Sequence, residues 1–246
     1  DIAPLQERPE SVGIIGAGPA GLAAADVLRR AGVQVTVYDR HDRAGGLLTY
    51  GIPGFKLEKD VVMRRIAQLE RSGVTFVMNC DIGTDLSFQA LRGRHDAVLV
   101  ATGVYKSRDL GGPGAGATGI VRAIDYLIAS NRVGFGDDVA EYDNGTLNAM
   151  GKRVVVIGGG DTAMDCVRTA VRQVATSVKC LTRRDRANMP GSQRDVANAE
   201  EEGVEFVWLT NPKGFTGDPV TGVIVQKMRL GEPDVSGRQS PDPLGG

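Results

Sequence analysis

The sequence predicts an α/β fold built from two similar domains, because one pattern of residues occurs in it twice. The pattern is an apolar strand, a glycine-rich turn, a helix and a second strand, and its copies begin near residues 12 and 154. Glycine, with 34 residues, follows no collagen-like period, so the glycines are interpreted as turn and close-approach positions. A repeated unit of this kind is typical of Rossmann-like three-layer domains.

The first copy of the pattern occupies the first half of the chain. An apolar strand is predicted over residues 12–15, and a helix over about 19–31 ends at Gly32. Alternating apolar and β-branched residues predict the next strand over 33–38, which completes a β-α-β unit. The other elements expected here are a loop over 45–54, a helix over 58–72 and strands over 74–78 and 97–101.

The second copy follows a stretch rich in glycine and proline at 111–116, which marks a crossover between domains. The elements expected after it are helices over 120–130, 161–174 and 195–202, strands over 154–157, 178–182, 204–208 and 222–230, an irregular connector over 133–150, and a turn-rich tail over 231–246. The domains are therefore expected at 1–111 and 151–246, with residues 112–150 as the connector.

Composition weighs against several classes of protein. The 246 residues allow one or two domains, and 29 basic against 30 acidic residues argue against nucleic acid or a membrane surface as the partner. No apolar run approaches the roughly 20 residues that span a bilayer. The polar N-terminal segment is unlike a signal peptide. The cysteines, Cys80, Cys166 and Cys180, are too scattered for a disulfide framework, so a cytoplasmic location is expected.

Residues 16–21, GAGPAG, form a Gly-x-Gly-x-x-Gly motif between a predicted strand and a predicted helix. Gly16 permits the tight turn, Gly18 lets a pyrophosphate approach the backbone, and Gly21 lets the helix pack closely on the strand. Phosphates would bind the free N–H groups at the positive end of the helix. Asp39 ends the second strand, where its carboxylate would bind ribose hydroxyls and repel a 2′-phosphate. The alternative is a tight turn followed by a surface aspartate.

Residues 158–163, GGGDTA, form the related motif Gly-x-Gly-x-x-Ala after another predicted strand. The next strand runs into Arg183 and Arg184, which the sequence places where the first unit has Asp39. Arginine at this position accommodates a 2′-phosphate, which its planar guanidinium binds through paired N–H donors. Asp161 is a candidate cap of the helix. The alternative is a solvated basic turn over 183–186.

The two turns predict two different dinucleotides in one chain, FAD in the first unit and NADPH in the second. Hydride would pass from the nicotinamide to the flavin, and because the cofactors carry this chemistry no catalytic side chain is assigned. His41 and His95 belong to no motif with a partner, so they are interpreted as surface or packing residues. The cysteines form no C-x-x-C pair and are too few for an iron–sulfur cluster, so they are interpreted as inert buried thiols and no metal site is expected.

Four segments resemble the glutamate synthase small (beta) subunit family. They are GGLLTYGIPGFK at 45–56, ATGVYK at 101–106, GGGDTAMDC at 158–166 and NMPGS at 188–192. The resemblance extends over nearly the whole chain and is much more specific than the two glycine motifs. The reductase half of dihydropyrimidine dehydrogenase and the adrenodoxin-type reductases share a looser version.

The resemblance implies an enzyme that takes electrons from NADPH onto FAD. Electrons would then pass through iron–sulfur clusters to an FMN-bearing large (alpha) subunit, the expected partner, which reduces the imine formed from 2-oxoglutarate and glutamine-derived ammonia to glutamate. The resemblance also implies that the NADPH domain is inserted into a discontinuous FAD domain. The family's cysteine-rich cluster domain and the C-terminal part of the FAD domain are absent from this sequence, so the chain is expected to be a fragment of the subunit.

The resemblance also implies which residues contact the cofactors. On the FAD side these are Gly16, Ala17, Gly18, Pro19 and Ala20 at the pyrophosphate, and Asp39, Gly46, Leu47, Lys56, Ile82, Thr102 and Gly103 elsewhere. On the NADPH side these are Gly158, Gly160, Asp161 and Thr162 at the pyrophosphate, and Arg183 and Arg184 at the 2′-phosphate. The alternatives are core packing for Leu47 and Ile82, a solvated side chain for Lys56, and a strand end for Thr102 and Gly103.

Two other functions stay open at this point. A related NADPH-dependent electron-transfer reductase would pass electrons to ferredoxin, or would resemble dihydropyrimidine dehydrogenase. A non-catalytic NADPH-binding module would bind the nucleotide without reducing a flavin. Reduction of bound flavin by NADPH separates both enzymes from the module.

Overall fold

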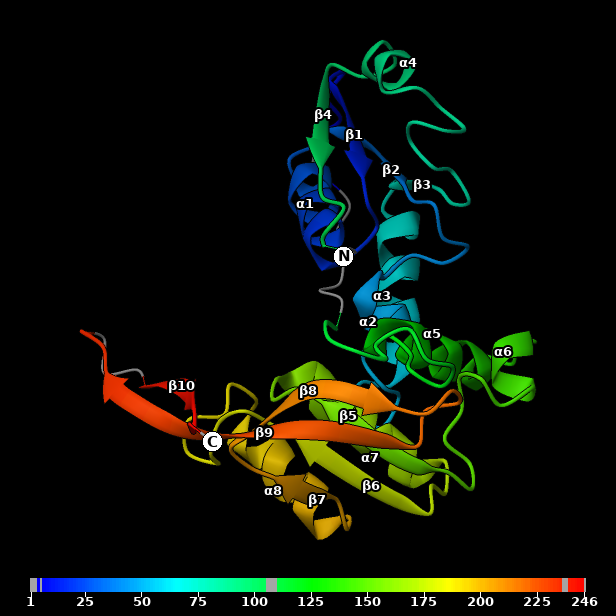
Figure 1. The fold of residues 1–246 in the computed structure, drawn as a ribbon. Helices are drawn as coiled ribbons and strands as arrows, with labels where there is room; N and C mark the ends of the chain where they lie inside the picture. Colours follow the sequence, from blue (N-terminus) through cyan, green and yellow to red (C-terminus); the bar gives the residue numbers. More distant parts are fainter. Residues whose placement is uncertain (1–3, 5, 105–109, 236–238, 246) are drawn as a thin grey trace. The chain divides into compact units, whose positions relative to one another are not determined.

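A computed structural model of the protein describes residues 4, 6–104, 110–235 and 239–245. The chain divides into two compact units, unit 1 at Asp1–Lys106 and unit 2 at Ser107–Gly246 (Figure 1). Each unit contains a parallel sheet with helices packed on it, so the predicted α/β fold class is confirmed. None of the described helices is long and apolar enough to cross a membrane.

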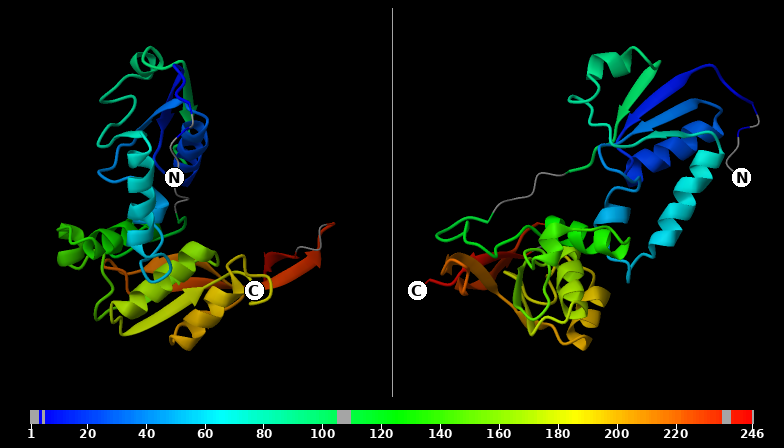
Figure 2. Two further views of the ribbon diagram at one scale, coloured as in Figure 1. Left: turned by 180° about the vertical axis from the view of Figure 1, so that it is seen from behind. Right: turned by 90° about the vertical axis from the view of Figure 1, so that its right-hand side faces the viewer.

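The parallel sheet of unit 1 has the strand order β3-β2-β1-β4. Its strands are β1 (Ser11–Ile15), β2 (Gln34–Tyr38), β3 (Thr75–Val77) and β4 (Ala97–Val100). The helices α1 (Pro19–Arg30) and α3 (Lys59–Arg71) lie together on one face of this sheet (Figure 2). Ile14, Val37 and Leu69 are fully buried between them. Each such side chain contributes roughly 1.5–3 kcal/mol by burial, which fixes the carboxyl ends of β1 and β2.

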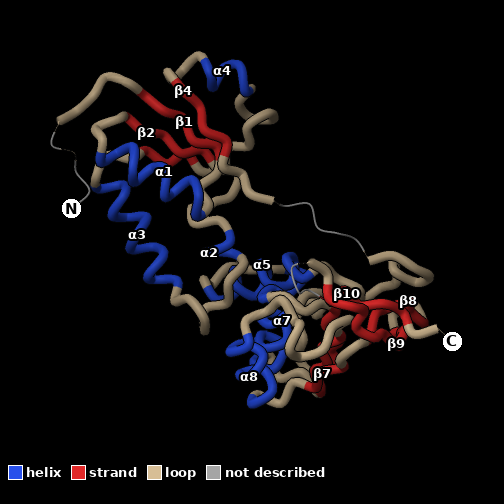
Figure 3. The backbone as a smooth tube through the Cα atoms, turned by 90° about the vertical axis from the view of Figure 1, so that its left-hand side faces the viewer, coloured by secondary structure: helices blue, strands red, loops and turns tan. Residues whose placement is uncertain are grey.

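The parallel sheet of unit 2 has the strand order β5-β6-β7. Its strands and principal helices are β5 (Arg153–Ile157), β6 (Ser177–Leu181), β7 (Glu205–Val207), α5 (Ala123–Gly134), α7 (Asp161–Arg172) and α8 (Gln193–Glu201). The helix α7 is central, because it packs on β5 and β6. It also lies against α5 and α8 (Figure 3). Met164, Val167 and Val196 are fully buried in this core.

A second, antiparallel sheet in unit 2 differs from the sequence prediction. Its strand order is β10-β9-β8, with β8 at Thr210–Thr216, β9 at Gly222–Pro233 and β10 at Gln239–Pro243. Only β9 is predicted, because Pro212 in β8 and Pro241 in β10 indicate turns. Both strands are edge strands whose pairing shifts register beside these prolines, and an edge tolerates a missing N–H donor.

The short helices also differ from the prediction. They are α2 (Leu47–Tyr50), α4 (Phe88–Arg92) and α6 (Ala140–Asp143), and each has about one turn, too short to show a helical period. The helix expected over 120–130 is α5, which begins at Ala123 and extends to Gly134, into the predicted connector. Tyr105 and Lys106 of the segment 101–106, and residues 236–238 and 246 of the tail, lie outside the described residues.

Candidate dinucleotide-binding sites

The first glycine turn, residues 16–21, connects β1 to α1, and close packing requires two of its glycines. Gly16 has a φ of +107°, and a Cβ there would lie 2.5 Å from the carbonyl oxygen of Ala101. A Cβ at Gly21 would lie 1.9 Å from the carbonyl oxygen of Gly16. At Gly18, in contrast, a Cβ would meet no heavy atom of the described residues within 4 Å. The backbone at Gly18 therefore faces open space, as close approach of a ligand requires.

The amino end of α1 suits an anionic ligand. Gly18 is its N-cap, and among the described residues no side chain caps the helix or places a carboxylate in its first turn. Pro19 occupies the first turn, where a missing N–H costs no hydrogen bond. The N–H groups of Ala20 and Gly21 follow, and helical carbonyl partners are lacking at this end. Partial positive charge and an open backbone therefore coincide, as binding of a pyrophosphate requires.

Asp39, directly after β2, is buried, with 8% of its surface exposed. Its Oδ2 accepts a 2.7 Å hydrogen bond from the Ala17 N–H, and its Oδ1 accepts a 2.9 Å hydrogen bond from the His41 N–H. Burial acts to raise the pKa of Asp39, but hydrogen bonds from His41 and Ala17 outweigh it, so the pKa lies below its ordinary value. The carboxylate is therefore charged at neutral pH and is attached to the glycine turn.

His41, interpreted as a surface or packing residue, has a partner in the site. Its Nδ1 lies 2.8 Å from Oδ1 of Asp39. The sequence does not indicate this pair, because the two side chains meet only through the conformation of the turn after β2. His95 packs on the sheet, since a Cβ at Gly13 would lie 2.6 Å from its ring and its Nε2 lies 3.0 Å from the Tyr38 hydroxyl.

A pocket of about 120 Å³ in unit 1 is lined mainly by residues at and just after the carboxyl ends of the strands. It brings together four residues predicted to contact FAD, namely Gly16, Asp39, Ile82 and Thr102. Its other lining residues are Ile15, Tyr38, Arg40, Cys80 and Asp81. The sequence analysis assigned none of these five to the site, although the last three each follow a predicted strand. The carboxyl ends of parallel strands meet at one edge of the sheet, and this signal could have found them.

Cys80 differs from the other two cysteines. Cys166 and Cys180 are buried, and burial raises the pKa of both thiols to about 12. Cys80 is half-buried and lines the pocket, so the expectation of a buried thiol is wrong there. Burial also raises the pKa of Cys80, so all three side chains are uncharged thiols at neutral pH.

The loop after β2 lies on the first glycine turn. The Gly45 N–H donates a 2.8 Å hydrogen bond to the Ala17 carbonyl. A Cβ at Gly46 would lie 2.8 Å from the Cα of Gly18, and Gly46 has a φ of +52°. Gly46 is therefore brought beside the open backbone where the pyrophosphate is predicted to bind.

Besides Gly46 and the glycine-turn residues 17–20, three further predicted FAD contacts lie outside the pocket. Leu47 is 45% exposed at the start of α2, so its alternative as a core residue is wrong. Lys56 is exposed in the turn that follows α2. Gly103, with a φ of +70°, is exposed beside the pocket residue Thr102. Their relation to a cofactor stays a prediction.

The second glycine turn, residues 158–163, connects β5 to α7. Gly158 has a φ of +151°, and a Cβ there would lie 3.3 Å from the Cβ of Ala163. A Cβ at Gly160 would meet no heavy atom of the described residues within 4 Å. Gly160 is the N-cap of α7, which no side chain in the described part of the chain caps. The open backbone and the uncapped helix end thus recur in unit 2.

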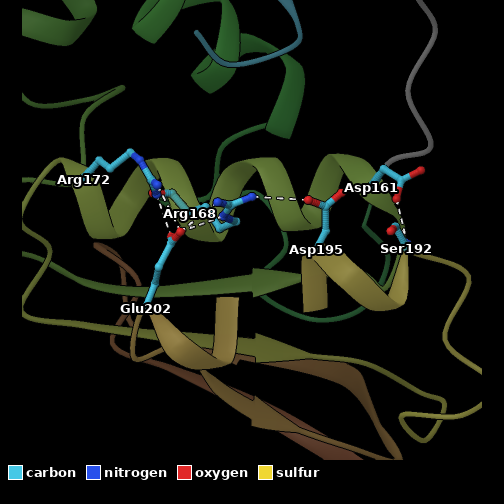
Figure 4. Close-up of polar contacts among 6 residues, drawn as sticks. All are labelled: Asp161, Arg168, Arg172, Ser192, Asp195 and Glu202. Carbon is cyan, nitrogen blue, oxygen red and sulfur yellow. Dashed lines mark hydrogen bonds and ion pairs between the residues drawn. The ribbon is translucent and has the colours of Figure 1, made fainter. Parts of the chain in front are cut away.

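Asp161 and Thr162 are exposed at the start of α7. The interpretation of Asp161 as a cap of its own helix is wrong, because its side chain reaches the neighbouring helix. Its Oδ1 accepts a 2.9 Å hydrogen bond from the N–H of Ser192, the N-cap residue of α8 (Figure 4). The backbone N–H of Asp161 stays in the first turn of α7, where N–H groups lack helical carbonyl partners.

The backbone register corrects the placement of Arg183 and Arg184. The N–H of Asp39 pairs with β3 at 3.1 Å, and the N–H of Thr182 pairs with β7 at 3.2 Å. Thr182 is thus the counterpart of Asp39, and the arginines follow one and two residues later. The pairing of the strands fixes this correspondence between the two units, and sequence spacing alone does not reveal it. Arg183 is exposed, whereas Arg184 is half-buried and its Nη1 donates a 3.3 Å hydrogen bond to the Asn188 carbonyl.

An ion-pair network, called the α7–α8 network here, joins these two helices (Figure 4). The Arg168 guanidinium, buried with 8% exposed, lies 2.8 Å from Glu202 and 3.2 Å from Asp195. Arg172 lies 2.6 Å from Glu202. Hydrogen bonds from Arg172, joined by those from Arg168, outweigh the effect of burial and lower the pKa of Glu202 to about 2. The network therefore fixes α8 against α7.

Comparisons with known proteins agree with this geometry. A family described as pyridine nucleotide-disulphide oxidoreductase matches residues 10–235. A putative glutamate synthase [NADPH] small chain of Cereibacter sphaeroides is 75% identical over 99% of this chain and 58% of its own length. The glutamate synthase [NADPH] small chain of Azospirillum brasilense is 63% identical over 99% of this chain and 51% of its own length. The chain thus spans about half the length of the curated relatives it matches.

A solved structure shows the same fold. FprA from Mycobacterium tuberculosis in complex with NADPH matches with a TM-score of 0.80 at 19% identity, over 97% of this chain and 68% of that chain. At this identity the likeness concerns the fold alone. The relatives confirm the resemblance to the glutamate synthase small subunit. By the family match over nearly its whole length, the chain belongs to the pyridine nucleotide-disulphide oxidoreductase family.

Proposed function

We propose that this chain is the part of a glutamate synthase small subunit that takes electrons from NADPH onto FAD. The observation that carries the proposal is the charge directly after the second strand, which differs between the two units. Unit 1 has the buried carboxylate of Asp39 there, followed by Arg40, whereas unit 2 has the uncharged Thr182, followed by Arg183 and Arg184. A nucleotide without a 2′-phosphate suits the first, and one with a 2′-phosphate suits the second.

The residues of unit 1 fit FAD. Gly18 leaves open space above the amino end of α1 for a pyrophosphate. The pocket beside it holds Asp39, whose two oxygens have accepted hydrogen bonds and keep lone pairs for a ribose hydroxyl. When bound, a flavin supplies the two-electron chemistry that accepts a hydride from a reduced nicotinamide. The chain's own residues bind and orient it, and the first domain of the proposal is 1–111.

The residues of unit 2 fit NADPH. Gly160 leaves open space at the amino end of α7, as Gly18 does in unit 1. Thr182 replaces a carboxylate that would repel a 2′-phosphate, and Arg183 and Arg184 supply guanidinium donors directly after it. The second domain of the proposal is 151–246, with 112–150 as the connector.

The names of the relatives support the wider activity. As a small chain, the protein would assemble with a large subunit, and electrons would pass to that subunit through iron–sulfur clusters. The large subunit would then form glutamate from 2-oxoglutarate and glutamine-derived nitrogen. The charge balance and the absence of a membrane-spanning helix among the described residues are compatible with a cytoplasmic enzyme of this kind.

The first test compares NADPH and NADH binding by calorimetry in the wild type and in the double variant Arg183→Ala, Arg184→Ala. Hydrogen bonds to a charged group contribute about 1.5–3 kcal/mol, or roughly ten- to a hundredfold in affinity. We expect the affinity of the variant for NADPH to fall by that factor and its affinity for NADH to stay unchanged. Arg186→Ala is the matched control, because Arg186 is engaged in a surface ion pair with Glu200 at 2.8 Å.

Equal binding of NADPH and NADH by the wild type would remove the assignment of unit 2 to NADPH. Anaerobic addition of NADPH to an FAD-loaded sample then tests the flavin step. Loss of the oxidised flavin absorbance supports the reductase. Persistence of that absorbance with tight NADPH binding supports a non-catalytic NADPH-binding module.

A further inference from the structure

We propose that the turn 188–192 forms a second wall of the dinucleotide site in unit 2. We further propose that Asp161 is a positioning residue whose carboxylate holds this wall in place. The inference rests on the proposed binding of NADPH to unit 2. It assigns a role to the Asp161 side chain other than contact with the pyrophosphate.

The first argument is a second repeat, found outside the glycine motifs. In unit 1 the Gly45 N–H donates a 2.8 Å hydrogen bond to the carbonyl of Ala17, the second residue of its glycine turn. In unit 2 the Gly191 N–H donates a 2.8 Å hydrogen bond to the carbonyl of Gly159, also the second residue of its turn. Each donor belongs to the segment that follows the second strand of its unit. The turn 188–192 is therefore the counterpart of the loop at Gly45.

The second argument is the crowding at this contact. A Cβ at Gly191 would lie 3.1 Å from the carbonyl oxygen of Gly159, so the two backbones touch. A Cβ at Gly159 would lie 2.9 Å from the Thr182 Oγ1 and 3.4 Å from the Met189 side chain. Met189 is buried in the core of unit 2, with 5% exposed. The turn is thus anchored beside the glycines, at the edge of the open space in front of Gly160.

The third argument is the hydrogen bond that exists only in unit 2. The position of Asp161 is occupied by Pro19 in the first glycine turn, and proline has no side chain that can accept a hydrogen bond. In unit 2 the Asp161 Oδ1 accepts the Ser192 N–H at 2.9 Å and so ties the end of the wall to the start of α7. A carboxylate pointed at a pyrophosphate would repel it. Its engagement with Ser192 gives this charge a role that needs no contact with phosphate.

The fourth argument connects the wall to the arginines. Arg184 donates a 3.3 Å hydrogen bond to the Asn188 carbonyl at the first residue of the wall. At the other end, the α7–α8 network holds α8, which begins directly after Ser192 (Figure 4). The wall is therefore held at both ends. Release at Ser192 would loosen Arg184 together with the wall, so it should lower NADPH affinity more than NADH affinity.

The experiment uses two matched pairs of variants. Asp161→Asn keeps an oxygen that accepts the Ser192 N–H, and Asp161→Ala removes it. Ser192→Pro removes the N–H donor at a residue whose φ of −55° proline tolerates, and Ser192→Ala keeps the donor and removes the hydroxyl. NADPH and NADH affinities are measured by calorimetry, and the melting temperature of each variant is recorded.

We expect Asp161→Ala and Ser192→Pro to bind NADPH about tenfold more weakly, the effect of one hydrogen bond to a charged group. Their NADPH to NADH affinity ratio should fall, while Asp161→Asn and Ser192→Ala stay near the wild type. A purely structural role would lower the melting temperature and leave the ratio unchanged, which overturns the proposal. Equal weakening by Asp161→Asn and Asp161→Ala also overturns it, because the charge would then matter and the hydrogen bond would not.

If Ser192→Pro does not fold, the comparison of Asp161→Asn with Asp161→Ala tests the proposal by itself. Failure of the proposed function is recognised separately, because the wild type would then fail to prefer NADPH.

Discussion

The two glycine turns are built on one backbone frame, yet the side chains beside them present different charge to a nucleotide. In unit 1 the His41 carbonyl accepts a hydrogen bond from the Asn79 N–H at 2.9 Å, and in unit 2 the Arg184 carbonyl accepts one from the Leu209 N–H at 3.2 Å. Asn79 and Leu209 have positive φ angles of 53° and 50°. An unfavourable backbone conformation for a non-glycine residue thus recurs at the same point of both units.

Two side chains carry the difference between the two frames. Asp39, Arg40 and His41 in unit 1 correspond to Thr182, Arg183 and Arg184 in unit 2, so the middle position is arginine in both and only the first and third differ. The Asp39 Oδ1 accepts the His41 N–H at 2.9 Å, and the Thr182 Oγ1 accepts the Arg184 N–H at 3.4 Å, so even the local hydrogen bond is shared. The comparison teaches that few side chains on a fixed frame determine the charge that a nucleotide meets.

The largest difference in stability between the two units is expected at the last residue of the glycine motif. Gly21→Ala places a Cβ 1.9 Å from the Gly16 carbonyl oxygen, so we expect unit 1 to lose about 3 kcal/mol of unfolding free energy by overpacking. Its counterpart in unit 2 is already alanine, and Ala163→Gly should cost at most about 1 kcal/mol. Hydrogen exchange of the β1 and β5 amides measures the two units separately. Similar losses in both units would contradict this account of the packing.

A smaller difference in stability between the two units is expected for substitutions at the end of the second strand. Asp39→Asn turns an amide N–H₂ toward the N–H donors of Ala17 or His41, so we expect a loss of about 2 kcal/mol in unit 1. Thr182→Val, its counterpart, removes only a long hydrogen bond and should cost about 1 kcal/mol or less. Unit-resolved denaturation checks both values. If the two variants lose the same amount, Asp39 does not hold the first glycine turn.

The smallest difference is expected in the pH dependence of the helix pairs. The pKa of Glu202 is lowered from 4.5 to about 2, so its stabilising contribution is complete above pH 4.5 and is lost as the pH falls toward 2. Glu202→Gln should therefore lower the stability of unit 2 by about 1.5 kcal/mol at pH 7 and flatten its decline in acid. The control is Asp26→Asn in unit 1, which breaks the pairs of Asp26 with the exposed guanidinium groups of Arg30 and Arg65. It should cost less than about 1 kcal/mol. If the stability of the Gln variant declined with falling pH as steeply as that of the wild type, Glu202 would not be the source of this pH dependence.

The sequence predicts the elements whose pattern is local. The strand β1, the helix α1 and the strand β2 follow from apolar periodicity and from the glycine that ends the helix. The edge strands β8 and β10 do not, because their prolines indicate turns and only pairing with β9 makes them strands.

The site is predictable to a similar degree. The glycine turns and Asp39 are found by spacing, and the structure places Gly16, Asp39, Ile82 and Thr102 around one pocket. The partner of His41 and the contact of Gly191 with Gly159 depend on how a loop returns to the sheet. No local sequence pattern indicates where such a loop contacts the sheet.

The attachment of Asp39 to the glycine turn has an evolutionary consequence. In unit 1 the side chain expected to select the nucleotide also holds the backbone through Ala17, so a mutation that changes preference there also weakens the fold. In unit 2 Arg183 is exposed, so substitutions at that position should change the nucleotide preference with almost no effect on stability. Descendants of such a chain should therefore exchange NADPH for NADH far more readily than they replace the dinucleotide of the first unit.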